Sequence, residues 1–274
     1  MLTPPKHWTL DDITWNRFAP AKVDPEILRI IKAASLVEQN GADYATYLNN
    51  VFAGDREFQK AADAWALEEV QHGQALKRWA QLADPSWDFE ASFRRFTDTY
   101  RLPLDVKDSV RGSRSGELIA RCIVETGTSS YYTALAEASD EPVLQQVCRK
   151  IAADELRHYK LFYTHMERYL AAERLGFWGR LRTGLGRILE SEDDELACAY
   201  WAANGSGPYV RKPNSRAYAR RAYSVYQPHH VERGIAMAMK AVGLSPQGRL
   251  HGILSRFAGW IMRTRVASLA RAGA

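Results

Sequence analysis

The chain has 274 residues, of which 46% are hydrophobic and 25% are charged, and its formal net charge is +5. These proportions are ordinary for a globular protein with a substantial core. The three cysteines are too few and too widely spaced for a disulfide framework, or for a Cys-ligated zinc or rubredoxin-type iron site. No segment has the length and apolar character of a transmembrane helix or a signal sequence, so we expect a cytoplasmic protein.

Residues 1–24 are predicted to form an N-terminal arm of irregular structure. The arm contains prolines, which favour turns, and the aromatic residues Trp8, Trp15 and Phe18. Because aromatic rings bury large apolar surfaces, we expect these three side chains to hold the arm against the rest of the protein.

A first helix is predicted to begin at Asp24-Pro25-Glu26, since Asp caps helices and Pro is favoured at their first position. Apolar residues follow one helical face from Ile27 to Leu48, and Glu38 lies within that face. A buried carboxylate costs several kcal/mol unless it is paired or bound to a cation. Glu38 is therefore a candidate metal ligand.

Three further helices are predicted, over residues 57–82, 117–138 and 143–173. A looser segment with a short helix of its own connects the second helix to the third. The second helix carries Glu69 and His72, and the fourth carries Glu155 and His158. Residues three apart lie on one face of a helix, so each pair can direct an oxygen and a nitrogen at one point.

Each Glu-x-x-His motif follows a single glutamate, Glu38 or Glu125, by 31 or 30 positions, with a helix breaker near the middle of each interval. If each interval is an antiparallel hairpin, both of its glutamates lie about fifteen residues, or roughly 22 Å, from the turn and meet at the same depth. One such motif alone is more often a solvated pair. Two matched copies predict an all-α four-helix bundle over residues 25–173 with a dinuclear metal site. The predicted ligands are Glu38, Glu69, His72, Glu125, Glu155 and His158.

Carboxylates and imidazoles without thiolates suit iron or manganese. Four carboxylates balance the charge of two divalent ions, whereas without metal they would repel one another and take up protons. Asp154 and Glu68, which precede two of the ligands, are candidates to orient the histidines from outside the metal. The alternative for both is a charge on the helix surface.

Two segments carry a family resemblance. Residues 65–73, Trp-Ala-Leu-Glu-Glu-Val-Gln-His-Gly, resemble the second-helix motif of the soluble acyl-acyl carrier protein desaturases, and residues 151–158, Ile-Ala-Ala-Asp-Glu-Leu-Arg-His, are similar to their fourth-helix motif. Tyr44 follows Glu38 at the family's interval. Thr128 lies three residues after Glu125, where the family has a threonine beside the oxygen site. The resemblance covers residues 37–169, and Val70, Gln71 and Leu156 depart from the family pattern.

The resemblance implies a ferritin-like fold for residues 25–173, with additional C-terminal helices. It also implies an oxygen-activating di-iron centre that takes electrons from a ferredoxin-like donor and desaturates an acyl chain on acyl carrier protein or another acyl donor. It also implies that Thr128 supplies a proton or hydrogen bond at the oxygen site. The alternative is that Thr128 bonds back to its own helix. Two other functions stay open: a ferritin-like or rubrerythrin-like protein that oxidises iron or removes peroxide, and a non-catalytic bundle. A di-iron hydroxylase or N-oxygenase is a further variant.

Residues 174–274 are predicted to form a basic helical region packed on the bundle. From residue 171 onward the chain has 16 Lys and Arg against 7 Asp and Glu. A positive surface attracts acidic proteins, anionic lipids and nucleic acids alike. The family resemblance favours an acidic protein partner, and a homodimer stays open. Residues 249–271 combine apolar residues with five arginines, which favours a docked terminal helix over a membrane-surface helix.

Overall fold

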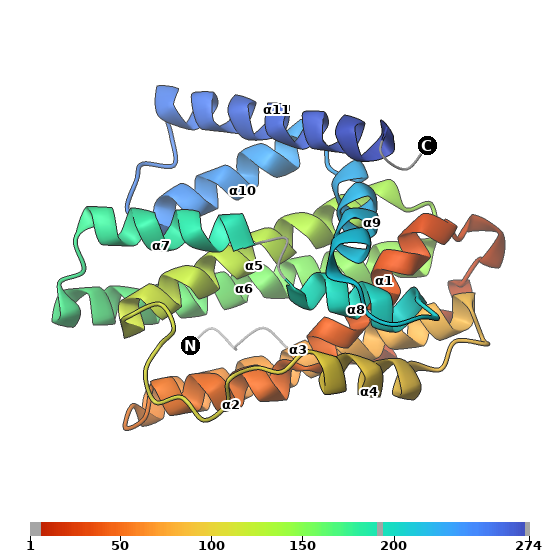
Figure 1. Cartoon of the computed structure of the whole chain (residues 1–274), viewed down its shortest axis with the longest axis horizontal. Coiled ribbons are helices and arrows are strands. Elements are labelled where there is room, and N and C mark those ends of the chain that lie inside the picture. The colour runs from red at the N-terminus through yellow and green to blue at the C-terminus, as the bar shows by residue number, and fades with distance from the viewer. Residues whose placement is uncertain (1–6, 191–193, 272–274) are drawn as a thin grey trace.

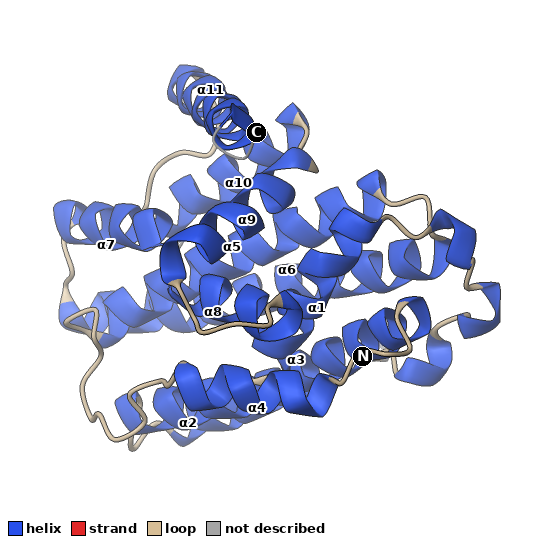
Figure 2. Cartoon of the chain, turned by 45° about the vertical axis from the view of Figure 1, so that its right-hand side comes forward, coloured by secondary structure: helices blue, strands red, loops and turns tan. Residues whose placement is uncertain are grey.

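The computed structural model describes residues 7–190 and 194–271, which form helices and loops without a strand (Figures 1 and 2). The predicted all-α class is therefore confirmed for these residues. Within the same ranges, no helix has both the length and the apolar character required to cross a membrane.

The long helices pair as two hairpins. Helix α3 (Arg56–Ala83) packs against α1 (Pro25–Gln39) and α2 (Gly41–Val51), while α5 (Arg114–Ala138) packs against α6 (Pro142–Glu173). Contacts between α3 and α6 join the hairpins, and α4 (Phe89–Thr99) is the short helix expected in the connecting segment. The bounds of α3, α5 and α6 agree with the sequence prediction to within three residues.

Capping residues explain where four of these helices begin. Each side chain accepts a hydrogen bond from a free backbone N–H in the first turn of its helix, which would otherwise lack a partner. The capping residues are Asp24 for α1, Asp55 for α3, Ser113 for α5 and Glu141 for α6. The predicted start at Asp24-Pro25 is thus confirmed.

The prediction of one continuous helical face from Ile27 to Leu48 is wrong. The helix breaks at Asn40, so that α1 ends before it and α2 begins after it. At the break the chain comes very close to α3. A Cβ added to Gly41 would lie 2.7 Å from the Cβ of Glu69, and one added to Gly73 would lie 2.6 Å from the backbone nitrogen of Gln39. Two glycines therefore permit a backbone approach that periodicity alone did not reveal.

Buried apolar side chains form two separate core clusters, one toward each end of α3, α5 and α6. Along α3, one cluster ends at Ala66 and the other begins at Ala75. Along α6, the order is reversed, with the boundary between Ala152 and Tyr159. The predicted metal ligands occupy the intervals between the clusters, so the candidate site lies in a polar layer within an otherwise apolar bundle.

The described residues of the C-terminal region form five α-helices, which pack on the bundle or on one another. They are α7 (Phe177–Leu189), α8 (Asp194–Asn204), α9 (Arg211–Ser224), α10 (Pro228–Ala241) and α11 (Arg249–Arg271). Helix α8 packs on α1, α7 and α10 pack on α5, and α11 packs on α9 and α10 (Figure 1).

The described part of the N-terminal arm consists of short 3-10 turns that contact the bundle. Trp8 and Ile13 are buried, and Trp15 and Phe18 pack against the same core cluster, as expected from the aromatic residues. The first six residues of the predicted arm lie outside the described part of the chain.

Candidate metal centre

The structure brings all six predicted ligands together in two overlapping groups. One group consists of Glu38, Glu69, His72 and Glu155, and the other of Glu69, Glu125, Glu155 and His158. In each group, one potential ligand atom per residue lies within 4.8 Å of all the others. Glu69 and Glu155 belong to both groups.

The histidine Nδ1 atoms point into the cluster. Nδ1 of His72 lies 3.3 Å from an oxygen of Glu155 and 3.7 Å from one of Glu38. Nδ1 of His158 lies 3.0 Å from an oxygen of Glu69 and 3.6 Å from one of Glu125. The rings of the two histidines are 5.7 Å apart between centroids. Each helix hairpin therefore contributes to both groups.

The cluster contains buried polar atoms that have no hydrogen-bond partner within the described part of the chain. These atoms are Oε2 of Glu38, Oε1 of Glu69, Nδ1 of His72, Oε1 of Glu155 and Nδ1 of His158. Buried polar groups are rarely left unpaired, because each one costs free energy comparable to a lost hydrogen bond. Converging oxygen and nitrogen lone pairs fit a cation. The cluster can therefore hold a metal ion.

The outer nitrogens of the two histidines contact carboxylates in a crossed pattern. Nε2 of His72 on α3 lies 3.0 Å from Asp154 on α6. Nε2 of His158 on α6 lies 3.1 Å from Glu68 on α3. When Nε2 carries the proton and donates it to the carboxylate, the lone pair of Nδ1 is left facing the cluster. These contacts favour the orienting role for Asp154 and Glu68 over that of simple surface charges.

Residues that the sequence reasoning missed hold Asp154 and Glu68 in place. The indole N–H of Trp8 donates to Asp154 at 2.7 Å, and its ring stacks on His72 at an interplanar angle of 6°. The guanidinium of Arg157 donates to both Asp154 and Glu68. Trp8 was expected only to fasten the arm. No periodicity signals its contact with a residue 146 positions away.

The pKa shifts within the cluster reflect its burial and crowded charge. Burial, together with the charges of Glu155 and Glu38, raises the pKa of Glu69 well above its usual value. Burial likewise raises the pKa of Glu125 to about 8. Burial opposes ionisation of Glu155 as well, but close contacts with His158 and His72 outweigh it and lower that pKa. When no metal is bound, these groups therefore titrate together. Some of the carboxylates stay protonated, and the positive charge of the histidines balances the others.

Both histidines are more basic than usual. Burial alone would lower their pKa values, but close contacts with the surrounding carboxylates outweigh it and raise them. The pKa of Asp154 is lowered against the effect of burial by its hydrogen bond with His72. An ionised Asp154 thus faces the Nε2–H of His72, as the orienting role requires.

Thr128 faces the cluster. Its hydroxyl donates to Oε2 of Glu155 at 2.8 Å, and it also lies 3.2 and 3.3 Å from carbonyl oxygens of its own helix. The Thr128 hydroxyl therefore makes both of the contacts considered for it, one with the cluster and one with its own helix. Tyr44, in contrast, donates to Glu195 on α8 at 2.5 Å rather than to a ligand.

Tyr132 was not predicted, yet it donates a short hydrogen bond to Glu38. Burial and the charge of Glu38 raise the pKa of Tyr132 well above its usual value, so its hydroxyl keeps the proton that Glu38 accepts. Tyr132 follows Glu125 by seven positions, or two helical turns. This spacing is the one sequence signal that could have placed it on the same face of the helix.

A third group of potential ligands, Glu137, His229 and His230, lies where α10 begins. The backbone N–H of Gln227 donates to Nδ1 of His230 at 2.9 Å. The neutral imidazole must therefore carry its proton on Nε2, which faces Glu137 at 3.1 Å. A protonated nitrogen cannot bind metal, so the two histidines here fit the start of a helix rather than a metal site.

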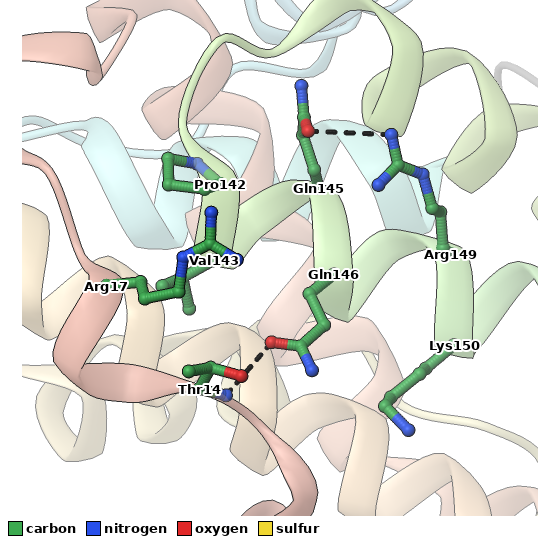
Figure 3. Close-up of a pocket in the computed structure, with 8 residues that line it drawn as sticks. All are labelled: Thr14, Arg17, Pro142, Val143, Gln145, Gln146, Arg149 and Lys150. Atoms are coloured by element: carbon green, nitrogen blue, oxygen red, sulfur yellow. Dashed lines mark hydrogen bonds between the residues drawn. The ribbon is translucent and has the colours of Figure 1, made fainter.

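Two surface pockets lie away from the cluster. One, of about 370 Å³, is formed by the arm and the start of α6 (Figure 3). Arg17, Arg149 and Lys150 are among its lining residues. The other, of about 160 Å³, lies between the start of α1 and the end of α9. None of the six predicted ligands lines either pocket.

Searches against protein-family models and curated proteins find no match to this chain. Its class is therefore defined by the fold and site alone. It is a helical protein whose buried glutamates and histidines form two overlapping groups that can hold metal ions.

Proposed function

We propose that the chain is a ferritin-like di-iron protein that acts as an O₂-dependent oxidoreductase on a long acyl chain. The observation that carries the proposal is the sharing of Glu69 and Glu155 between two four-residue ligand groups. A mononuclear site would need only one group. Two groups with two common carboxylates match the ligand set of dinuclear carboxylate bundles, in which four helices supply four carboxylates and two imidazoles.

The donor set and its charge are compatible with two ferrous ions. Four ionised carboxylates neutralise two divalent ions, which lets the loaded cluster sit between two apolar cores without net charge. Manganese has the same ligand preferences, so metal analysis of the purified protein distinguishes the two metals. The chemistry that a di-iron pair supplies is the reduction of dioxygen coupled to oxidation of a substrate.

In desaturation, two hydrogen atoms leave adjacent carbons of the acyl chain. Together with two electrons from a ferredoxin-like donor and two protons, they reduce one O₂ to two molecules of water. The chain's own residues bind and orient the metals and exclude water, since five of the six ligand residues are buried. Thr128 is only partly buried, and its hydroxyl can hold or pass a proton at the cluster's edge.

The acyl substrate, the acyl carrier protein and the ferredoxin-like donor are proposed on the sequence resemblance of residues 37–169. The basic C-terminal region would attract either acidic protein. Its arginines and lysines are separate from the acidic metal layer, so docking and chemistry would use different surfaces.

A second candidate is a ferritin-like or rubrerythrin-like protein without an organic substrate, which would use the same two ligand groups. An iron-oxidising or peroxide-removing protein needs only a path for small molecules. The buried cysteines offer no rubredoxin-type site to such a protein.

Metal stoichiometry tests the shared-ligand arrangement. We expect two irons per chain after anaerobic loading with ferrous iron, and substantially less than one in the Glu69→Ala/Glu155→Ala double variant. The matched control is Glu57→Ala, because Glu57 is on the same helix as Glu69 but is 76% exposed. A wild-type chain that binds one iron, or a double variant that still binds two, contradicts the proposed site.

Single-turnover oxidation tests the substrate. The reduced, iron-loaded protein is exposed to O₂ with an acyl-carrier substrate, and the product is analysed by mass spectrometry. Loss of two hydrogens per acyl chain supports desaturation. Oxygen consumption with an unchanged acyl chain supports the second candidate instead, and addition of one oxygen atom indicates hydroxylation.

A further inference from the structure

Helix α11 carries a stripe of large apolar side chains that face away from the protein. Leu250, Ile253, Phe257 and Trp260 are 47%, 63%, 56% and 54% exposed. Their spacing of three, four and three residues places them on one side of the helix, over about 15 Å. Such a stripe along one helix is unusual for a surface in permanent contact with water.

Arginines line one edge of this stripe. Arg249, Arg256 and Arg263 recur at intervals of seven residues and are exposed. At 100° per residue, they project next to Ile253 and Trp260 rather than on the opposite side of the helix. Helix α11 contains no acidic residue. Its outer face is therefore both apolar and strongly positive.

The opposite face of α11 holds the helix on the protein. Ser255 is 5% exposed, and Nε2 of His251 lies 3.0 Å from the carbonyl oxygen of Glu232 on α10. Figure 1 shows α11 at the outer edge of the molecule, above α10. The sequence prediction of a docked terminal helix accounts for this inner face but leaves the apolar stripe unexplained.

We propose that the outer face of α11 docks on the surface of an anionic lipid bilayer. Helices that lie in a membrane interface combine Trp, Phe and Leu on one side with Lys and Arg that reach lipid headgroups. The exposed stripe would enter the boundary between headgroups and acyl chains, while the three arginines pair with lipid phosphates. The helix stays parallel to the membrane, so no segment needs to span it.

Helix α7 is a second basic helix with exposed apolar side chains. Trp178, Leu185 and Leu189 are exposed on one face of α7, and the helix contains three arginines and no acidic residue. In Figure 1, α7 lies below α11, with α10 between them. The stripe on α11 is therefore the surface that the proposal uses.

A second copy of the chain fits this face less well. Pairing two α11 helices through their stripes would bring arginines close to arginines, with no acidic residue on the helix to compensate. An acidic protein would satisfy the charges but would have to bury a stripe of four large apolar residues. Both occupants are outcomes of the experiment below.

Vesicle co-sedimentation of the full chain tests the proposal. The vesicles contain phosphatidylcholine alone or phosphatidylcholine with phosphatidylglycerol. We expect binding to the anionic vesicles and much weaker binding to the neutral ones. Replacing Arg249, Arg256 and Arg263 with Gln should weaken it by about fivefold per arginine, or on the order of a hundredfold together. The Phe257→Ser/Trp260→Ser variant should weaken it by about tenfold or more.

The matched control is Leu67→Ser. Leu67 is 74% exposed but lies on α3, away from α11 (Figure 1). Its replacement should leave vesicle binding unchanged, and circular dichroism should show the same helix content in all variants. Iron content is measured alongside, so a failure of the metal proposal is seen separately from a failure of lipid docking.

Three results would overturn lipid docking. The first is an absence of binding to anionic vesicles, and the second is equal loss of binding in the Leu67 and Phe257/Trp260 variants. The third is a wild-type dimer in sedimentation velocity that the Phe257/Trp260 variant converts to a monomer, which would assign the stripe to a second copy. Binding to acyl carrier protein or ferredoxin that depends on Phe257, without vesicle binding, would assign it to an acidic protein.

Discussion

Replacing Gly73 with alanine is expected to disturb the point where the helix break at Asn40 meets α3. The new Cβ would lie 2.6 Å from the backbone nitrogen of Gln39 and 2.8 Å from its Cα. Both are backbone atoms, so no side-chain rotation relieves the overlap. Because Gly73 follows the ligand His72 and Gln39 follows the ligand Glu38, separating these segments also moves two ligands apart.

The expected cost follows from two opposing effects. Overpacking a well-packed site costs about 1 to 3 kcal/mol, and contact with two backbone atoms places this substitution toward the upper value. Alanine is about 1 kcal/mol better than glycine within a helix, which offsets part of that cost. The net loss of about 2 kcal/mol corresponds to a melting temperature roughly 4 to 8 °C lower.

Gly127→Ala provides the control, because it is the same chemical change in a position with open space. A Cβ added to Gly127 on α5 has no neighbour within 4 Å, so helix propensity alone should act and raise the melting temperature by roughly 2 to 4 °C. Thermal unfolding and iron content are measured on both variants. If Gly73→Ala is as stable as wild type and binds the same amount of iron, the close backbone approach at this position is not a constraint.

Three further predictions address the contacts around the bundle. Asp154→Ala removes the carboxylate that faces Nε2 of His72 and should weaken metal affinity by about 10- to 100-fold in chelator competition. Glu141→Ala removes the cap of α6 and the acceptor for the buried indole of Trp79, and should lower the free energy of urea unfolding by about 2 to 4 kcal/mol. Burial raises the pKa of Glu125 from 4.5 to about 8, so the metal-free fold keeps a proton that the unfolded chain has released; its stability should therefore fall as the pH rises from 4.5 to 8.

Each of these has a control and an opposing result. Asp98→Ala, an exposed position on α4, should not change metal affinity; equal effects of the Asp98 and Asp154 variants would count against the orienting role. Glu57→Ala should change unfolding by far less than Glu141→Ala. Urea unfolding of chelator-treated protein at pH 6 and 8 checks the proton prediction, and greater stability at pH 8 would contradict it.

The sequence was sufficient to predict the long helices α3, α5 and α6 and the meeting of the six glutamate and histidine side chains, because both depend on regular spacing along the chain. Glu69 and His72 share a helix face whatever surrounds them, and an antiparallel hairpin fixes the depth of Glu38 from its distance to the turn. The break at Asn40 was not predictable in this way. It coincides with the close approach of Gln39 and Gly73, which are 34 positions apart and show no common periodicity.

What the sequence alone determined, then, was the all-helical class and the residues able to meet in one polar layer, since helical periodicity and hairpin length fix direction and depth. Only the tertiary structure decided how the chain surrounds that layer: the crossed contacts of Asp154 and Glu68, the indole of Trp8 on His72, and the outward face of α11. These depend on which elements pack together and at what angle. Side-chain packing between segments far apart in the sequence sets that geometry, and such contacts leave no periodic pattern in the sequence from which they could be predicted.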